Sequence, residues 1–207
     1  MIRRHDILGN LRVARCARAH SISHPTSETG GNPVAVAATI KPERSEFLPY
    51  YGKYIDLVAS GDVLTTLSKQ MAETLRLLRS LHASVATYRY APGKWSVNEV
   101  IGHLIDSERI FAGRALRFAR ADGTPLPGFE QDDYVSNSSF DLYPLGELAS
   151  ELGSVRESTI FLFRHLQEDA WTRRGTANGA EVSVRALAYI IAGHELHHRE
   201  ILRARYL

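Results

Sequence analysis

Hydrophobic residues recur at intervals of three and four positions in four segments of this chain, at about residues 62–82, 97–121, 145–167 and 184–206. That spacing places them on one face of an α-helix, because a helix completes a turn about every 3.6 residues. In the first helix, the residues predicted to face inward are Leu64, Leu67, Met71, Leu75 and Leu78. No segment shows the alternation of hydrophobic and polar residues that is typical of a half-buried strand. The pattern therefore predicts an all-α protein built as an antiparallel four-helix bundle.

Local signals predict where these helices begin. Ser96 and Glu99 form the pattern of a capping box at the start of the second helix. Pro144 suits the first turn of the third helix, and Ser183 is a suitable N-cap for the fourth. The connections 122–144 and 169–182 are longer than a turn between helices requires, so they are candidate pocket walls. An aromatic-rich stretch over 42–58 is expected to pack across the bundle.

Composition limits the classes of protein to consider. The chain has 207 residues, of which 44% are hydrophobic, enough for a full core. Residues 1–40 are rich in arginine, glycine, serine and proline, and we expect a disordered extension there and the bundle domain in 41–207. A net charge of +2 without a basic stripe argues against nucleic acid as a partner. No apolar run reaches the roughly 20 residues that span a membrane.

The cysteine content indicates a compartment. Cys16 is the one cysteine of the chain, so it forms no internal disulfide and no cysteine-based zinc site. A chain of this kind fits the reducing cytoplasm.

Two histidines occupy positions in the last helix where aliphatic side chains are expected. The inward residues there are Leu187, Ile191, His194, His198, Ile201 and Leu202. Because His194 and His198 are four residues apart, both rings lie on one side of the helix, with Cα atoms about 6 Å apart along the axis. A polar ring in a core costs free energy unless a cation or a hydrogen bond compensates it. We interpret this pair as metal ligands, with structural core histidines as the alternative.

The third ligand is expected upstream of this pair. The segment matches His-Glu-x-x-His, with Glu195 where a metalloprotease has its base. The extended protease pattern needs a further histidine where this chain has Ala204, so a protease site is disfavoured. Among the other histidines, His103 borders the inner face of the second helix and is the favoured ligand. His82, His165 and His197 are expected at helix ends or at the rim of the core.

The sequence assigns no catalytic residue. Glu99 and Asp106 lie one turn before and one turn after His103, where they are either carboxylates that orient this ligand or solvated acids on the helix surface. Glu195 is either a proton shuttle or an exposed partner of Arg199, four residues on.

Three segments together carry a resemblance to a known family: Lys94 to Leu104, Pro125 to Phe129, and Gly193 to His198. They resemble the DinB-like (YfiT-like) superfamily of metalloproteins, over about residues 40–207. The resemblance implies a four-helix bundle that binds a divalent metal ion, zinc or nickel, through His103, His194 and His198. It also implies a homodimer. Relatives of this kind include S-transferases that use low-molecular-weight thiols, a mycothiol-dependent isomerase and proteins labelled as metal-dependent hydrolases.

Three functions follow as alternatives. Three neutral imidazoles leave a tetrahedral ion one open position, which is the pattern of a catalytic site. The leading expectation is an S-transferase in which a small thiol binds the metal as thiolate and attacks an electrophilic small molecule. A metal-dependent hydrolase that uses hydroxide at the metal is the second. A non-catalytic, stress-associated helical binding protein is the third.

Overall fold

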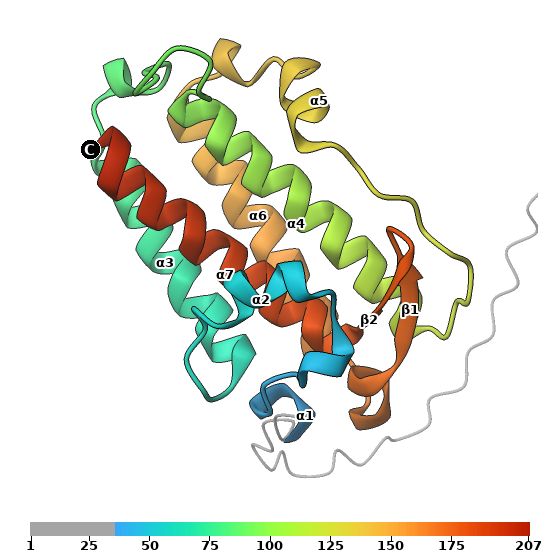
Figure 1. The fold of residues 1–207 in the computed structure, drawn as a ribbon. Coiled ribbons are helices and arrows are strands. Elements are labelled where there is room, and N and C mark those ends of the chain that lie inside the picture. Colours follow the sequence, from blue (N-terminus) through green and yellow to red (C-terminus); the bar gives the residue numbers. More distant parts are fainter. Residues whose placement is uncertain (1–35) are drawn as a thin grey trace, which may run out of the picture. The chain divides into compact units, whose positions relative to one another are not determined.

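Residues 36–207 are described in a computed structural model, and four long helices form their framework (Figure 1). These are α3 (Val63–Ser80), α4 (Val97–Ala119), α6 (Leu145–Arg164) and α7 (Val184–Ile201). Each begins at or next to its predicted start, and a π-helical turn, η6 (Leu202–Tyr206), follows α7. The predicted all-α four-helix bundle is confirmed. Residues 1–35, which include Cys16 and most of the expected extension, lie outside the described residues.

The predicted helix caps are present. The Ser96 hydroxyl accepts a hydrogen bond from the backbone N–H of Glu99 at 3.0 Å, and the Glu99 carboxylate accepts one from the N–H of Ser96 at 2.8 Å. The Ser183 hydroxyl accepts from the N–H of Ala186 at 3.0 Å. These bonds satisfy backbone donors that a helix leaves unpaired at its first turn, so they fix where α4 and α7 begin.

The order of the helices around the bundle differs from their order in the chain. α7 packs against α3 and α4, and α6 packs against the same two helices, so α3 and α4 lie diagonally opposite each other. Figure 1 shows α4 and α6 running in the same direction, opposite to α3 and α7. The neighbouring helices α4 and α6 are therefore parallel, whereas the sequence predicted an antiparallel arrangement. A parallel pair requires a connection that returns along the whole bundle. Because the 23 residues of α4 span about 35 Å, the connection formed by residues 120–144 has to be long.

Short elements precede α3, and one of them covers one side of α7. They are α1 (Val36–Thr39), η1 (Arg44–Glu46), η2 (Pro49–Tyr51) and α2 (Gly52–Ile55). The aromatic stretch therefore packs across the bundle as predicted, with α2 lying over α7 (Figure 1). The backbone N–H of Ala37 donates to the Glu168 carboxylate at 2.8 Å, and Ala38 is buried. Packed structure thus begins before residue 41, the expected boundary.

The two long connections contain structure that the hydrophobic pattern did not predict. Residues 169–182 hold most of η5 (Glu168–Thr172) and most of a hairpin of β1 (Arg174–Ala177) and β2 (Ala180–Ser183), which pair antiparallel. Its turn is Asn178-Gly179, with φ of 53° and 74°. Positive φ at both positions is the geometry of a type I′ hairpin turn. The first connection holds α5 (Gln131–Ser136) and η4 (Phe140–Leu142), and η3 (Ala83–Val85) follows α3.

A layer of buried polar side chains separates two hydrophobic clusters. One cluster gathers the first turns of α3 and α7, the last turns of α4 and α6, and the hairpin. The other gathers the opposite ends of the four helices. Between them lie Gln70, Thr74, His103, Ser107, Glu108, Arg156, Thr159, His194, Glu195 and Arg199. The predicted inner stripe of α3 is therefore only partly right, because Gln70 and Thr74 are buried while Leu64, Met71 and Leu75 are half-buried.

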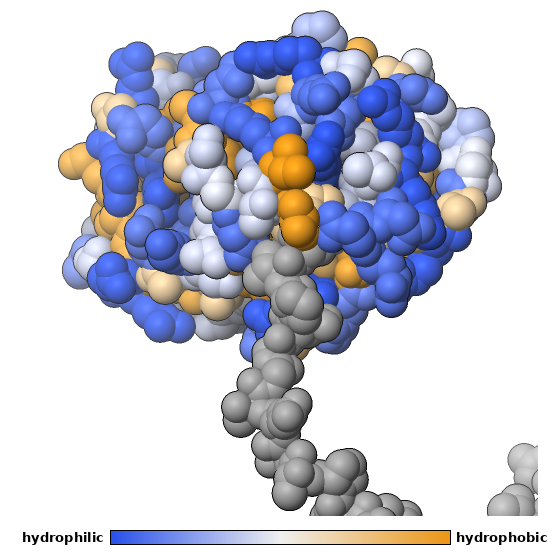
Figure 2. Space-filling view, turned by 90° about the horizontal axis from the view of Figure 1, so that it is seen from below, coloured by the Kyte–Doolittle hydropathy of each residue, from blue (hydrophilic) through white to orange (hydrophobic). Residues whose placement is uncertain are grey.

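One face of the described residues is mainly polar. Figure 2 shows a face on which hydrophilic side chains predominate and hydrophobic ones lie in small, scattered groups. Among residues 36–207, no helix combines the length and the hydrophobicity needed to cross a membrane.

Candidate metal centre

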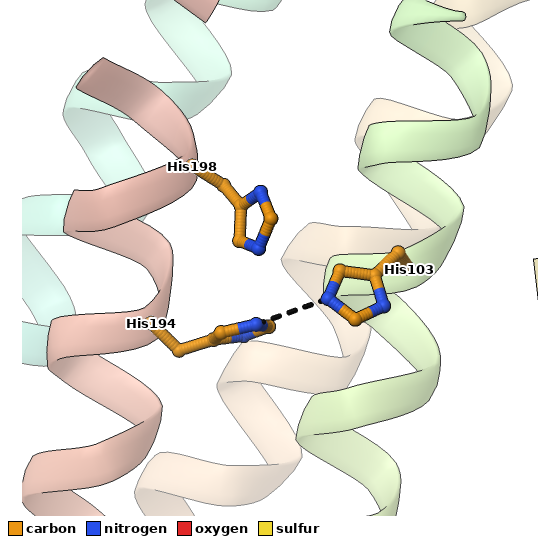
Figure 3. A group of neighbouring side chains, drawn as sticks. All are labelled: His103, His194 and His198. Carbon is orange, nitrogen blue, oxygen red and sulfur yellow. Dashed lines mark hydrogen bonds between the residues drawn. The ribbon is translucent and has the colours of Figure 1, made fainter. Parts of the chain in front are cut away.

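Three histidines from two neighbouring helices meet in the polar layer. His103 lies in the second turn of α4, and His194 and His198 lie one turn apart on α7. Figure 3 shows the three imidazole rings pointing toward one another across the space between these helices. His103 and His194 are buried, with 3% and 5% of their surface exposed. The structure thus brings together the three residues that the sequence singled out.

The ring nitrogens are close enough to share one ion. Nε2 of His103 lies 3.0 Å from Nε2 of His194. One nitrogen from each of the three rings, including that of His198, lies within 4.8 Å of the other two. Tetrahedral zinc with ligands at about 2.0–2.1 Å holds its donor atoms about 3.3 Å apart. Small movements of the side chains therefore suffice to fit this donor set to a divalent ion.

Burial keeps these rings neutral at ordinary pH. It lowers the pKa of His103 to about 4. The pKa of His198 falls to about 3, mainly through burial and then through the nearby His103 and His197. That of His194 also falls well below its usual value, chiefly because the ring is buried. A neutral imidazole has a free lone pair, which is the form that binds metal.

Two glycines allow close packing directly before two of these histidines. A Cβ atom on Gly193 would lie 2.1 Å from the carbonyl oxygen of Tyr54, so α2 crosses α7 at a point where only glycine fits. A Cβ on Gly102 would meet the ring of Phe140 at the same distance. The crossing of α2 holds the Tyr54 ring edge-on to His194, with ring centroids 5.2 Å apart. The aromatic residues of 42–58 predicted a segment that crosses the bundle, but nothing in their spacing connects Tyr54 with the histidines.

The carboxylates suggested as partners of His103 are engaged elsewhere. Glu99 accepts hydrogen bonds from Ser96 and Arg89. Asp106 lies 3.7 Å from Arg109. The partner of His103 is instead Ser107, whose hydroxyl lies 3.4 Å from Nδ1. The hypothesis that Glu99 or Asp106 orients this ring is therefore wrong, since each has its own partner on the outer side of α4.

Glu195 does not take the exposed position beside Arg199 that was one of its two interpretations. It is 2% exposed and accepts a hydrogen bond from Arg156 on α6 at 2.5 Å and another from Thr74 on α3 at 2.5 Å. It is neither exposed nor paired with Arg199, which binds Glu73 at 3.0 Å. The missed signal is the position of Arg156 and Glu108 within the hydrophobic stripes of α6 and α4, where a charged residue requires a buried partner.

The remaining histidines of the described chain lie apart from the cluster or at its edge. His82 and His165 are exposed, as expected for helix ends. His197 is half-buried and packs its ring against Tyr54 and His198 at centroid distances of 5.3 and 5.2 Å. The rim position predicted for His197 is confirmed.

A pocket of about 380 Å³ leads to the cluster. His103, His194 and Ser107 are among its lining residues, and the first long connection contributes Glu130 and Asp132. The aromatic residues that line it are Tyr50, Tyr51, Tyr54, Phe111 and Phe129. Both long connections contribute to the lining, the second through Asn178, so the prediction that they form pocket walls is confirmed.

The pocket also holds hydroxyl groups suited to bind a ligand. The hydroxyls of Tyr50 and Tyr54 are 3.5 Å apart. Burial raises the pKa of Tyr54, so its hydroxyl keeps its proton at neutral pH and can donate a hydrogen bond. The volume lies within the range of about 300–1,000 Å³ that is usual for small-molecule sites.

The described chain is a helical bundle with a cluster of three neutral histidines, two of which line an aromatic pocket. These features define a class of protein: bundles with a candidate divalent-metal site next to a pocket for small molecules. Comparison with known proteins gives the family. The model of the DinB superfamily matches residues 66–202, and the chain belongs to that superfamily. The resemblance seen in the sequence is confirmed.

Individual relatives are more distant. A protein of Oceanobacillus iheyensis, named as a candidate metal-dependent hydrolase, is 26% identical over 138 residues, which cover 65% of this chain and 76% of that protein. YfiT from Bacillus subtilis, described as a probable metal-dependent hydrolase with an unusual four-helix bundle topology, matches with a TM-score of 0.59 and 16% identity. The match covers 84% of this chain and 98% of YfiT.

A mycothiol-dependent maleylpyruvate isomerase has a related structure, with a TM-score of 0.55 and 16% identity over 66% of this chain and 58% of that one. At these identities, the two solved structures show that the fold is shared.

Proposed function

We propose that this protein is a metal-dependent enzyme in which His103, His194 and His198 hold one zinc or nickel ion. The observation that carries the proposal is the meeting of ring nitrogens from three neutral histidines within 4.8 Å, two of which, His103 and His194, line a pocket. When bound there, a divalent cation would lower the pKa of a thiol or a water molecule at its open position.

We further propose that the reaction is the transfer of a small thiol to an electrophilic small molecule. Two buried carboxylates of the polar layer, Glu108 and Glu195, are both bound by Arg156. They are thus not free to act as a general base or as a nucleophile. A nucleophile supplied by a cosubstrate removes the need for either. In the reaction, a sulfur–carbon bond forms, the bond from carbon to its leaving group breaks, and the thiol proton passes to solvent.

The chain's own part in this reaction is to bind and orient. The rings of Tyr51, Phe111 and Phe129 offer an apolar wall, with Tyr51 and Phe129 edge-on to Phe111 at centroid distances of 6.1 and 6.2 Å. Such a wall suits the apolar body of an electrophile. The Tyr54 hydroxyl is placed to donate a hydrogen bond to a ligand in the pocket. A homodimer and a cytoplasmic location stay predictions from the sequence.

Hydrolysis is the second candidate, because two relatives are described as candidate metal-dependent hydrolases. One experiment separates it from thiol transfer. The full-length protein is loaded with zinc or nickel and given an aryl halide such as chlorodinitrobenzene, with and without mercaptoethanol or cysteine, and the thioether and phenol products are quantified. Thiol transfer predicts the thioether alone.

A matched pair of variants completes the test. His198→Ala removes a proposed ligand, whereas His165→Ala removes an exposed histidine directly after α6. Thiol transfer predicts loss of turnover in the first variant and full turnover in the second. Formation of phenol at the same rate without thiol contradicts transfer and supports hydrolysis. Binding of ligands without any turnover supports the non-catalytic alternative.

A further inference from the structure

A buried group of three charged side chains lies beside the histidines. The Arg156 guanidinium donates two hydrogen bonds to Glu108, at 2.8 and 2.7 Å, and one to Glu195 at 2.5 Å. The exposed fraction of each of these residues is 4% or less. The guanidinium is always protonated, and both carboxylates accept its hydrogen bonds. Two carboxylates on one guanidinium leave a formal charge of −1 in the core.

Neighbouring groups in the polar layer do not balance this charge. Thr74 donates its hydroxyl proton to Glu195 and accepts a longer hydrogen bond, of 3.4 Å, from Arg199. Arg199 in turn forms an ion pair with Glu73, whose side chain is 49% exposed. That pair is neutral by itself. Within the described residues 36–207, the group of Arg156, Glu108 and Glu195 therefore keeps its net negative charge.

This charge lies close to the three-histidine cluster. Glu195 directly follows His194, and Glu108 directly follows Ser107, the partner of His103. Glu108, Arg156, Glu195 and His194 line one cavity of about 10 Å³. Since the imidazoles are neutral, they bring no positive charge of their own to this part of the core.

The geometry points to Glu108 as a residue that strengthens cation binding at His103, His194 and His198 through its charge, without being a ligand. A buried net charge costs free energy unless an opposite charge is near it, and a divalent cation on three neutral imidazoles supplies that charge. The attraction is strong because the surroundings exclude water. This inference rests on the proposed metal centre, but it is independent of which reaction the centre performs.

The test compares two variants of the full-length protein. Glu108→Gln keeps the shape and an acceptor oxygen for Arg156 but removes the charge. Glu46→Gln is the matched control, because Glu46 is 3% exposed and bound to Arg185. Arg185 lies nine residues before His194 on α7, which is about 14 Å along the helix. Zinc affinity is measured by competition with a chromogenic chelator, and the visible spectrum of the cobalt(II) form reports the ligand set.

We expect Glu108→Gln to weaken zinc binding by about 10–100-fold, the range that partners of metal ligands usually show. Its cobalt spectrum is expected to match that of the wild type, because the three ligands stay in place. Glu46→Gln is expected to lower thermal stability and to leave zinc affinity unchanged. If Glu108 has a structural role only, the Glu108→Gln variant should instead show an altered cobalt spectrum, or should bind zinc as tightly as Glu46→Gln does.

A second variant guards against loss of folding. Glu195→Gln removes the other carboxylate charge and keeps an oxygen for Thr74, so it is expected to weaken zinc binding in the same way. Wild-type zinc affinity in a folded Glu108→Gln or Glu195→Gln variant overturns the inference alone. A wild-type chain that binds neither zinc nor cobalt overturns the proposed metal centre itself, so the two failures are distinguishable.

Discussion

Replacing Gly193 by alanine is expected to destabilise the protein, although alanine is the better helix former. The added Cβ would lie 2.1 Å from the Tyr54 carbonyl oxygen and 2.4 Å from its carbonyl carbon, whereas ordinary contact begins at 3.4 Å. Both neighbouring atoms are backbone, so no side chain can rotate away. α2 therefore has to move by more than 1 Å from α7.

The magnitude follows from two opposing effects. Overpacking of a core contact costs about 1–3 kcal/mol. The change from glycine to alanine inside a helix returns about 1 kcal/mol. Gly113 is a matched control, because it lies in the interior of α4 and a Cβ there meets no atom within 4 Å. Gly113→Ala is expected to show the stabilising effect alone, so the two variants should differ by about 1–3 kcal/mol.

Urea unfolding followed by circular dichroism measures this difference. Each kcal/mol corresponds to roughly 2–4 °C in the melting temperature of a domain of this size. Because α2 carries Tyr54, Gly193→Ala should also weaken the binding of ligands in the pocket. Equal stability of the two alanine variants would show that α2 does not lie against α7 as described.

Two further predictions concern charge in the core. Burial lowers the pKa of His103 to about 4 and that of His198 to about 3, so the unfolded chain takes up protons first as the pH falls below 6.5. The metal-free protein should thus keep its full stability above pH 6.5. As the pH falls to about 4, its free energy of unfolding should drop by on the order of 3 kcal/mol through His103 alone. A free energy of unfolding that stays constant over this range contradicts the account. Arg156→Met, which leaves two buried carboxylates without their cation, should cost about 3–5 kcal/mol. Arg44→Met, at an exposed ion pair, should cost less than about 1 kcal/mol, and equal melting temperatures of the two variants would contradict this assignment.

The fold was largely predictable because its strongest determinant is local. The 3.6-residue period and the caps at Ser96 and Ser183 depend on neighbouring residues only, and both gave helix starts that the structure confirms. The C-terminal ends of the helices were harder to predict, since α7 passes into a π-helical turn without a residue that signals the end of a helix. The hairpin was missed, although Asn178-Gly179 is a strong turn signal, because its strands have only four residues each.

In the candidate site, too, the features that depend on one helix were predictable and the contacts between helices were not. His103, His194 and His198 were found because histidines interrupt or border hydrophobic stripes. The partners of these residues were not found, because they depend on contacts between helices. Glu195 pairs with Arg156, 39 positions away, and α2 reaches His194 through a glycine crossing. Spacing along one helix cannot reveal either contact.

The central claim is that one divalent ion binds between α4 and α7. Metal analysis of untagged full-length protein, after loading with zinc or nickel and removal of the excess, tests it most directly when wild type, His103→Ala and His165→Ala are compared. The account predicts one ion per chain in the wild type and in His165→Ala, and almost none in His103→Ala. A wild-type protein without metal, or a His103→Ala variant that retains a full equivalent, would contradict it.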